Sequence, residues 1–306
     1  MLFVVNPSAS GGEVGRGWPK VESWLRTRFE DVEVSHTTGP GSATGIVRAA
    51  LLEGEEEIAV VGGDGTVNEA VNGFIEGDKP IRPGSRLTII PVGSGCDYAK
   101  TLELPRGLAN AELILESEQF RAVDVGRARY RNLQGATETR YFANILEAGV
   151  GGAVVDKVNR SSKLLGGRAA FLWAILTTLP SYRNRVVEVK VDEEVVATGP
   201  MNSVIVANGR YYGSGLKPAP EAEVDDGIFD VVLIGDVRFG EAVSSLRKLR
   251  KGEHLRHPKV THLRGTKVEA TSKDRVLAEM DGELVGTLPM GAVVLPRLLQ
   301  VRVLSG

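Results

Sequence analysis

The stretch from Ile58 to Gly73 constrains the fold more than any other part of this 306-residue chain. Its first four residues, Ile-Ala-Val-Val, form a short apolar run that is typical of a buried strand. The Gly-Gly-Asp-Gly turn at 62–65 ends this strand, and its glycines permit positive φ and a close approach of a ligand to the backbone. Apolar residues then recur at helical spacing, with Thr66 and Glu69 as an expected capping box. The stretch therefore predicts a strand, a glycine turn and a helix.

This turn favours phosphate chemistry. Free backbone N–H groups and the N-terminus of a helix form an anion site. Asp64 is unusual there, because its carboxylate repels a phosphate unless a metal ion or a transferable proton lies between them. That favours phosphoryl transfer over passive phosphate binding. The alternative is an ordinary strand-to-helix turn in which Asp64 only caps the helix.

Three further strands alternate with helices in the first hundred residues. They are expected at residues 2–5, 32–35 and 87–91, followed by polar or glycine-rich turns at 6–12, 36–39 and 92–100 and by helices that include about 18–29 and 42–53. This alternation predicts a parallel sheet wound with helices. All the turns follow the carboxyl ends of strands, where such sheets bind ligands.

After about residue 120 the pattern changes to short alternating segments, which predict an antiparallel β-rich domain. Two helices are expected within it, at about 153–159 and 167–179; the apolar run 171–176 in the second indicates either a core helix or one wall of an acyl-chain groove. The strands are expected at 121–129, 140–146, 186–191, 201–207, 229–234, 266–270 and 275–278.

Composition excludes several classes of protein. Hydrophobic content of 42% and charge of 25% are those of a soluble globular protein, and a net charge of -2 gives no sign of nucleic-acid binding. No apolar run approaches the roughly 20 residues that span a bilayer. One cysteine excludes an internal disulfide framework, so a reducing cytoplasm is expected. The basic run at 247–251 on an expected helix at 239–251 indicates either contact with an anionic membrane or a solvated face.

Several motifs resemble one family in the same order along nearly the whole chain. The run Gly-Gly-Asp-Gly-Thr followed by Val-Asn-Glu-Ala-Val-Asn-Gly resembles the diacylglycerol kinase catalytic domain of the lipid kinases, in the same superfamily as the NAD kinases. The segments 93–97, 225–227 and 281–283 resemble its later signatures, whereas the Thr-Gly-Ser-Thr-Ala-Tyr-type segment of NAD kinases does not occur. The resemblance implies a nucleotide-binding α/β domain at 1–120, with a doubly wound, mainly parallel sheet to which 291–306 return. It implies a lipid-binding antiparallel β-sandwich at 121–290.

The resemblance also implies substrates and the residues that hold them. It implies an ATP-dependent kinase for a lipid hydroxyl, with diacylglycerol as the leading substrate. Asp97 and Lys100 are expected at the substrate; Thr37 and Thr38 are the alternatives for contact with adenine or ribose, unless they cap helix 42–53. The residues expected at the nucleotide are Asn6, Pro7, Ser8, Ser10, Thr37, Thr38, Gly62, Gly63, Asp64, Gly65, Thr66, Asn68, Glu69 and Ser94.

A magnesium site and a general base complete the implied set. The resemblance assigns Mg²⁺ to the carboxylate of Asp226 and the carbonyl oxygens of Glu223 and Ile228, oxygen ligands that suit this ion. An ordinary polar β-turn is the alternative. Glu283 is expected to be the general base, with Asp64 and Asp281 holding metal or water.

Cys96 departs from the asparagine that the family usually has at this place. A glycine turn at a helix N-terminus is expected to lower the pKa of the thiol toward neutrality; the alternative is a buried thiol that acts as a small hydrophobe. Other functions stay open: a kinase for a sphingoid base, another membrane lipid or NAD, or a regulator that binds nucleotide or lipid without catalysis. A homodimer and peripheral contact with the inner membrane face also stay open.

Overall fold

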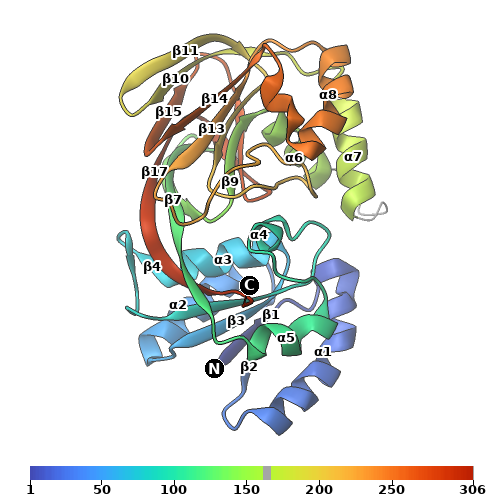
Figure 1. The fold of residues 1–306 in the computed structure, drawn as a ribbon, viewed down its shortest axis with the longest axis vertical. Helices are drawn as coiled ribbons and strands as arrows, with labels where there is room; N and C mark the ends of the chain where they lie inside the picture. The colour runs from blue at the N-terminus through green and yellow to red at the C-terminus, as the bar shows by residue number, and fades with distance from the viewer. Residues whose placement is uncertain (161–166, 306) are drawn as a thin grey trace. The chain divides into compact units, whose positions relative to one another are not determined.

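The computed structural model describes residues 1–160 and 167–305, and the side chains of 161–171 lie outside this description, including Phe171 of the predicted apolar run. The chain divides into two compact units (Figure 1). The first comprises Met1–Asp124 and Arg297–Gly306, and the second comprises Val125–Pro296. Two strands, β7 (Phe120–Asn132) and β17 (Glu283–Arg302), run across the division.

The first unit is built on a parallel sheet, as the alternation of strands and helices predicts. Its strands are β1 (Leu2–Val5), β2 (Glu33–His36), β3 (Glu57–Gly62) and β6 (Arg86–Pro91), in the order β2-β1-β3-β6. The end of β17 adds a further parallel strand, because Gln300 and Val301 pair with Arg86 and Leu87. All residues of β1 and β3 are buried, which explains the continuous apolar character of β1 and of β3 after Glu57.

Helices cover both faces of this sheet. On one face α1 (Ala9–Arg28), η1 (Leu108–Asn110) and α5 (Ala111–Glu116) pack on a core that includes Phe3 and Trp18. The other pair, α2 (Ser42–Glu53) and α3 (Asp64–Phe74), pack closely against each other (Figure 1). A Cβ on Gly73 would lie 2.8 Å from the carbonyl oxygen of Thr44, so glycine is required at this helix crossing.

Some local features of the first unit differ from prediction. Helix α1 begins at Ala9 rather than near residue 18, and Ser10, Gly11 and Gly12 form a kink with φ of 53°, 66° and 82°. A short hairpin of β4 (Ile75–Glu76) and β5 (Lys79–Pro80) was not predicted. The helix expected after Cys96 is present as α4 (Asp97–Thr101), which has only five residues.

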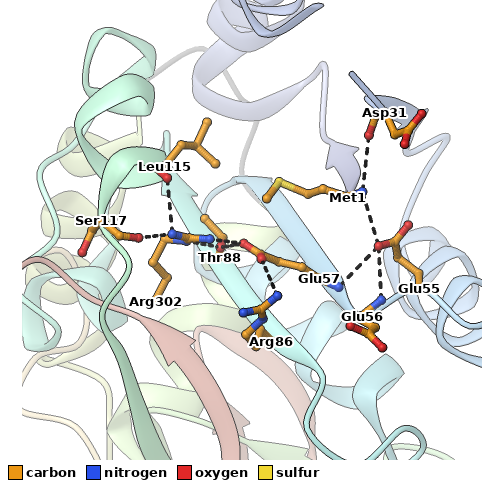
Figure 2. A network of polar contacts seen from close by, with 10 residues as sticks. All are labelled: Met1, Asp31, Glu55, Glu56, Glu57, Arg86, Thr88, Leu115, Ser117 and Arg302. Carbon is orange, nitrogen blue, oxygen red and sulfur yellow. Dashed lines mark hydrogen bonds and ion pairs between the residues drawn. The ribbon is translucent and has the colours of Figure 1, made fainter. Parts of the chain in front are cut away.

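A buried ion pair holds the end of the chain in the first unit (Figure 2). The guanidinium of Arg302 pairs with the carboxylate of Glu57 at the start of β3, and its Nε donates to Thr88 Oγ1 at 2.9 Å. Arg302 also donates to the carbonyl oxygens of Leu115 and Ser117. These contacts lie at the amino ends of the strands, away from the glycine turns.

The second unit is an antiparallel β structure, which agrees with the predicted fold class. Strands β14-β13-β12-β9-β16-β17 follow one another, and β15, β10 and β11 extend from β17. Side chains from both groups share one apolar core, in which Phe142 stacks on Phe229. The remaining bounds are β8 (Thr137–Phe142), β9 (Ile145–Gly149), β10 (Arg185–Val191), β11 (Glu194–Met201), β12 (Ser203–Ala207), β13 (Phe229–Ile234), β14 (Val260–Gly265), β15 (Lys267–Thr271) and β16 (Leu277–Met280).

The single strand predicted at 140–146 is wrong, because β8 and β9 are separated at Ala143 and Asn144. Helices α6 (Val150–Arg160), α7 (Gly167–Thr178) and α8 (Phe239–Lys251) and the turn η2 (Glu253–Arg256) accompany the strands. Among the helices of the described residues, none combines the length and the apolar character that crossing a bilayer requires.

Candidate functional site

Three loops meet at the carboxyl edge of the first unit's sheet. The side-chain amide of Asn6, after β1, donates to Thr66 Oγ1 at 2.9 Å, which ties the first loop to the loop after β3. The backbone N–H of Val92, after β6, donates to the carbonyl of Gly62 at 2.8 Å. A Cβ on Gly93 would lie 2.9 Å from the Cα of Gly63, so the second and third loops touch where only glycine fits. The predicted juxtaposition of these loops is therefore present.

The glycine turn after β3 differs in detail from prediction. Gly63 has φ −94°, and Gly62 and Gly65 are also outside the left-handed region, so the turn does not use the positive φ that its glycines permit. Helix α3 begins at Asp64, so Thr66 lies inside the first turn instead of capping it. The N-terminus of α3 has no side-chain cap, and its first backbone N–H groups therefore lack an intrahelical acceptor.

Glu69 caps a different helix from the one predicted. Its carboxylate accepts hydrogen bonds from the backbone N–H groups of Gly41 at 2.8 Å and Ala43 at 3.0 Å, at the start of α2. A carboxylate is favourable there because it opposes the positive end of the helix dipole. Glu69 therefore caps α2, and the alternative in which Thr37 or Thr38 caps this helix does not hold. The backbone N–H of Thr38 instead donates to Ser42 Oγ at 3.2 Å.

The loop after β6 surrounds Asp64. Asp64 Oδ1 accepts a hydrogen bond from the backbone N–H of Tyr98 at 3.2 Å, and a Cβ on Gly95 would lie 2.7 Å from Asp64 Oδ2. Asp97 is 4% exposed and pairs with Lys100, with 2.6 Å between Oδ1 and Nζ. Ser94 is exposed on the same loop. The structure thus brings the central carboxylate and the second motif together.

Cys96 does not have the reactive environment that its position predicts. It is buried, with 2% exposure, and it has φ 52° as the residue before α4. Burial raises the pKa of the thiol to about 11, and the negative charge of Asp64 adds to this effect, while Arg106 opposes it. The expected lowering of the pKa is therefore wrong, because α4 has only five residues and desolvation outweighs any dipole effect. The alternative of a buried, hydrophobic thiol holds.

The remaining residues expected at the nucleotide have varied surroundings. Ser8 is exposed and donates its backbone N–H to Asn6 Oδ1, and the hydroxyl of Ser10 donates to Glu13. The carbonyl of Pro7 accepts from the N–H of Gly15 at 3.1 Å. Thr37 is half-buried at the end of β2, whereas Asn68 is fully buried within α3.

In the second unit, Asp281 lies in the two-residue turn between β16 and β17. Asp281 and Gly282 have φ of 49° and 87°, which suits an Asp-Gly hairpin turn. The Asp281 carboxylate is buried and accepts three backbone hydrogen bonds, from the N–H groups of Ala143, Asn144 and Ile145 at 3.0, 3.1 and 2.8 Å. Both of its oxygens are occupied in holding the junction of β8 and β9.

Glu283 follows this turn and is more accessible. Its side chain is 36% exposed, and Oε2 pairs with the guanidinium of Arg140 on β8. The turn and the ion pair fix the position of a carboxylate that keeps access to solvent. Arg140 was not among the predicted residues, because 143 positions separate it from Glu283.

The expected magnesium loop contains an ion pair instead of an open ligand set. Asp226 Oδ1 accepts from the N–H of Ile228 at 3.1 Å, and Oδ2 pairs with the guanidinium of Arg264. Among the residues that the structure describes, no group of three or more His, Cys, Asp or Glu side chains is arranged to hold a metal ion. As arranged, the carboxylate of Asp226, the side-chain ligand in the expected set with Glu223 and Ile228, is paired with a guanidinium and does not fit a bound Mg²⁺.

An apolar cavity lies entirely within the second unit. Its cavity volume is about 90 Å³, within about 790 Å³ of space between the lining side chains that includes open solvent. Helices α6, α7 and α8 wall it with Val154, Ile175 and Leu246. The polar residues of its lining are Asn202, Ser203, Tyr212, Ser245, His254 and His257. The prediction of an apolar wall from residues 171–176 agrees with Ile175, although the side chain of Phe171 lies outside the description.

Two buried titratable groups beside this cavity were not predicted. Glu147 is fully buried and accepts hydrogen bonds from Ser203 Oγ at 2.6 Å and the N–H of Gly151 at 2.8 Å. Burial raises the pKa of this carboxyl, so the neutral form is favoured. His254 is 3% exposed, and burial lowers its pKa to about 4. A single glutamate or histidine in a mixed sequence gives no local signal of such burial.

Comparisons with known proteins agree with this architecture. Residues 1–128 match the family model of the diacylglycerol kinase catalytic domain. Residues 144–303 match the model of the YegS C-terminal NAD kinase beta sandwich-like domain. The chain belongs to the diacylglycerol kinase catalytic family. Family membership implies a kinase that uses ATP.

Relatives of this kinase match it from end to end. It is 29% identical to the diacylglycerol kinase of Bacillus subtilis over 305 residues, covering 98% of this chain and 94% of the relative. For the diacylglycerol kinase of Staphylococcus carnosus, identity is 27% over 300 residues, with coverage of 98% and 93%.

Solved structures agree on the fold of this kinase. A diacylglycerol kinase structure from Bacillus anthracis superposes with a TM-score of 0.71 at 23% identity, covering 98% of this chain and 95% of that chain. Yeast NADH kinase superposes with a TM-score of 0.57 at 9% identity, covering 100% and 83%. At these identities the likeness shows the fold alone.

Proposed function

We propose that this kinase transfers the γ-phosphate of ATP to the hydroxyl of a membrane lipid, with diacylglycerol as the substrate and phosphatidic acid as the product. The apolar cavity of the second unit is the observation that carries the proposal. A dinucleotide such as NAD has no acyl chain to fill a cavity walled by Val154, Ile175 and Leu246. Burying an acyl chain there is worth about 0.8 kcal/mol for each methylene removed from water.

The first unit supplies the nucleotide site in this proposal. The N-terminus of α3 and the glycine-rich backbone of 62–66 receive the phosphates of MgATP, because the backbone N–H groups and the dipole at a helix N-terminus favour an anion. The Asn6–Thr66 hydrogen bond holds the first loop beside them. Ser8, Ser10, Ser94 and either Thr37 or Thr38 complete the contacts with the nucleotide.

Asp64 has the central chemical role. Its half-buried carboxylate, held by the N–H of Tyr98, orients the metal-bound triphosphate that enters as part of the substrate. Lys100 balances the charge of the buried Asp97 beside the reacting groups. Positioning contributes more than base strength here, because phosphoryl transfer passes through a loose transition state.

Glu283 removes the proton from the lipid hydroxyl in this proposal. Arg140 fixes the side chain without removing it from solvent, which a group that must accept and release a proton requires. Asp281 positions Glu283 through the turn, since its carboxylate accepts three backbone N–H groups at the junction of β8 and β9.

We propose further that the helices around the cavity contact an anionic membrane at the cytoplasmic face, where ATP is available. Helix α7 exposes Leu172, Trp173 and Leu176 by 42, 59 and 40%. Helix α8 turns Leu246 and Leu249 toward the cavity and exposes basic side chains from 247 to 251. An apolar ridge with a tryptophan beside basic residues suits the boundary of an anionic bilayer.

The test is ATP consumption in mixed micelles with diacylglycerol, other lipids, sphingosine or NAD. Turnover that depends on diacylglycerol supports the proposal, and turnover with NAD alone overturns it. A cavity-filling variant, Val154→Phe, is expected to lower turnover of long-chain diacylglycerol more than that of a short-chain analogue. Leu52→Phe, at an exposed residue of the first unit, is the matched control.

Membrane contact needs its own measurement. Sedimentation with vesicles of phosphatidylglycerol and phosphatidylcholine is expected to pellet the kinase, and vesicles of phosphatidylcholine alone are expected to pellet less. Trp173→Ser should reduce pelleting, whereas Val195→Ser, at another exposed apolar residue, should not. Equal pelleting of both variants would remove α7 from the membrane-facing surface.

A further inference from the structure

The strand register of the second unit places a cation beside the Asp226 loop. Strands β13 and β14 are antiparallel, and Arg264 of β14 stands directly opposite Asp230 of β13. The loop that contains Asp226 leads directly into β13. One arginine therefore reaches both carboxylates: its Nη2 pairs with Asp226 Oδ2, and its Nε lies 3.9 Å from Asp230 Oδ2.

The two carboxylates have few oxygen atoms left for a metal ion. Asp226 Oδ1 accepts from the N–H of Ile228, and Asp230 Oδ1 lies 2.5 Å from His262 Nε2. Asp230 is 2% exposed, so water reaches it poorly. Mg²⁺ requires near-octahedral oxygen ligands at about 2.0–2.1 Å and retains several waters.

The positive charge of Arg264 also disfavours a metal ion in the Asp226 loop. The guanidinium of Arg264 is charged at every physiological pH and cannot give up its proton. A divalent cation on Asp226 would have to lie next to this fixed positive charge, which repels it. Binding of Mg²⁺ would therefore require the Arg264 side chain to leave the loop first.

We propose that Arg264 takes the place of a divalent cation in the Asp226 loop, so that this loop keeps its conformation without bound Mg²⁺. The Mg²⁺ that accompanies ATP is then the one that the kinase requires. The proposal concerns the second unit alone and does not depend on which lipid is phosphorylated. Its test consequently needs neither nucleotide nor lipid.

The experiment is thermal unfolding without nucleotide, in EDTA and across 0.1 to ~10 mM Mg²⁺. Adding Mg²⁺ is expected to change the melting temperature of the unaltered protein no more than it changes that of Asp226→Asn. Arg264→Gln should melt lower in EDTA and regain stability with Mg²⁺ in a saturable way. In the double variant Arg264→Gln with Asp226→Asn, Mg²⁺ should no longer raise the melting temperature. Arg185→Gln, which removes an exposed arginine 3.9 Å from Asp274, is the matched control.

Two results would overturn the proposal. One is a saturable rise of the melting temperature with Mg²⁺ in the unaltered protein that Asp226→Asn abolishes, because the loop would then bind the ion despite Arg264. The other is an Arg264→Gln variant that melts lower but does not respond to Mg²⁺. If Arg264→Gln does not fold, Arg264→Lys, which retains the charge, is expected to fold and to show no response to Mg²⁺; a saturable response would contradict the proposal.

Discussion

The carboxylate of Asp281 accepts a hydrogen bond from the backbone N–H of Ile145 at 2.8 Å, although 136 positions separate the two residues. With the bonds from Ala143 and Asn144, this contact fixes the turn that carries Glu283 to the junction of β8 and β9. The buried carboxylate of Asp281 thus determines where the accessible carboxylate of Glu283 lies.

Asp281→Asn should lower both stability and turnover. The amide replaces an acceptor oxygen with an N–H₂ group that faces backbone donors, and an unsatisfied buried group costs about 1–3 kcal/mol. Thermal unfolding and steady-state kinetics measure the two effects. Asp274→Asn, at an exposed aspartate of the same unit, is the control and should change neither. Normal turnover at reduced stability would show that the turn does not position Glu283 for the reaction.

Asp64→Asn should abolish most phosphoryl transfer while the fold persists. The amide still presents an oxygen to the N–H of Tyr98, but it lacks the charge that orients MgATP; loss of one such electrostatic contact typically costs 10²–10³-fold in rate. Turnover and a thermal melt should be measured together, with Asp31→Asn on an exposed loop as the control. Near-normal turnover would remove Asp64 from the catalytic set.

The Cys96 thiol should react slowly with iodoacetamide at pH 8, with or without MgATP. Its pKa of about 11 and its burial leave little exposed thiolate. The rate should rise strongly in urea, which exposes the side chain. Fast alkylation that MgATP suppresses would mean that the loop opens around the nucleotide.

Cys96→Asn should retain the activity of the protein and remove the slow reaction with iodoacetamide. Position 96 has φ 52°, and asparagine tolerates the left-handed region better than most residues. Cys96→Val provides the contrast, because a β-branched residue is strained at that φ and should lower the melting temperature. An inactive Cys96→Asn variant would show that the loop depends on a small apolar side chain.

Acidification should destabilise the protein through His254. Its pKa is lowered from 6.5 to about 4 in the folded state, so the unfolded state binds more protons between these values. Stability is therefore retained above pH 6.5 and lost as the pH falls toward 4, by an amount on the order of 2–3 kcal/mol. His254→Phe should flatten this part of the profile in urea unfolding measured from pH 7 to 4. An unchanged profile would assign the acid sensitivity to other groups.

The sequence predicted well those helices and turns that depend on residues close together in the chain. Helices α2 and α8 have the predicted bounds, and the glycine turns follow the predicted strands. Prediction failed where the partner is distant in the chain. Glu69 suggested a cap for its own helix, but the N–H groups that it binds belong to α2, 26 and 28 positions earlier.

The candidate site shows the same difference between local motifs, which were predicted, and long-range contacts, which were not. The motifs led to Asp64, Asp97 and Glu283, each of which begins an element directly after a turn: α3, α4 and β17. Their ion-pair partners and supports are set by tertiary packing. Arg264 reaches Asp226 only through the register of β13 and β14, which no short motif encodes, and the burial of Cys96 depends on packing that its position before α4 does not reveal.

The ion pair between Arg302 and Glu57 has a consequence for synthesis on the ribosome. Glu57 belongs to the stretch Met1–Asp124 of the first unit, but its buried partner Arg302 and the parallel strand at Gln300 and Val301 are translated after the whole second unit. Domains generally fold as the chain emerges, from the N-terminus onward. Until Arg302 is made, Arg86 is the cation available to Glu57 within this unit, so the buried ion pair and the last parallel strand of the first sheet form only after the second unit has been translated.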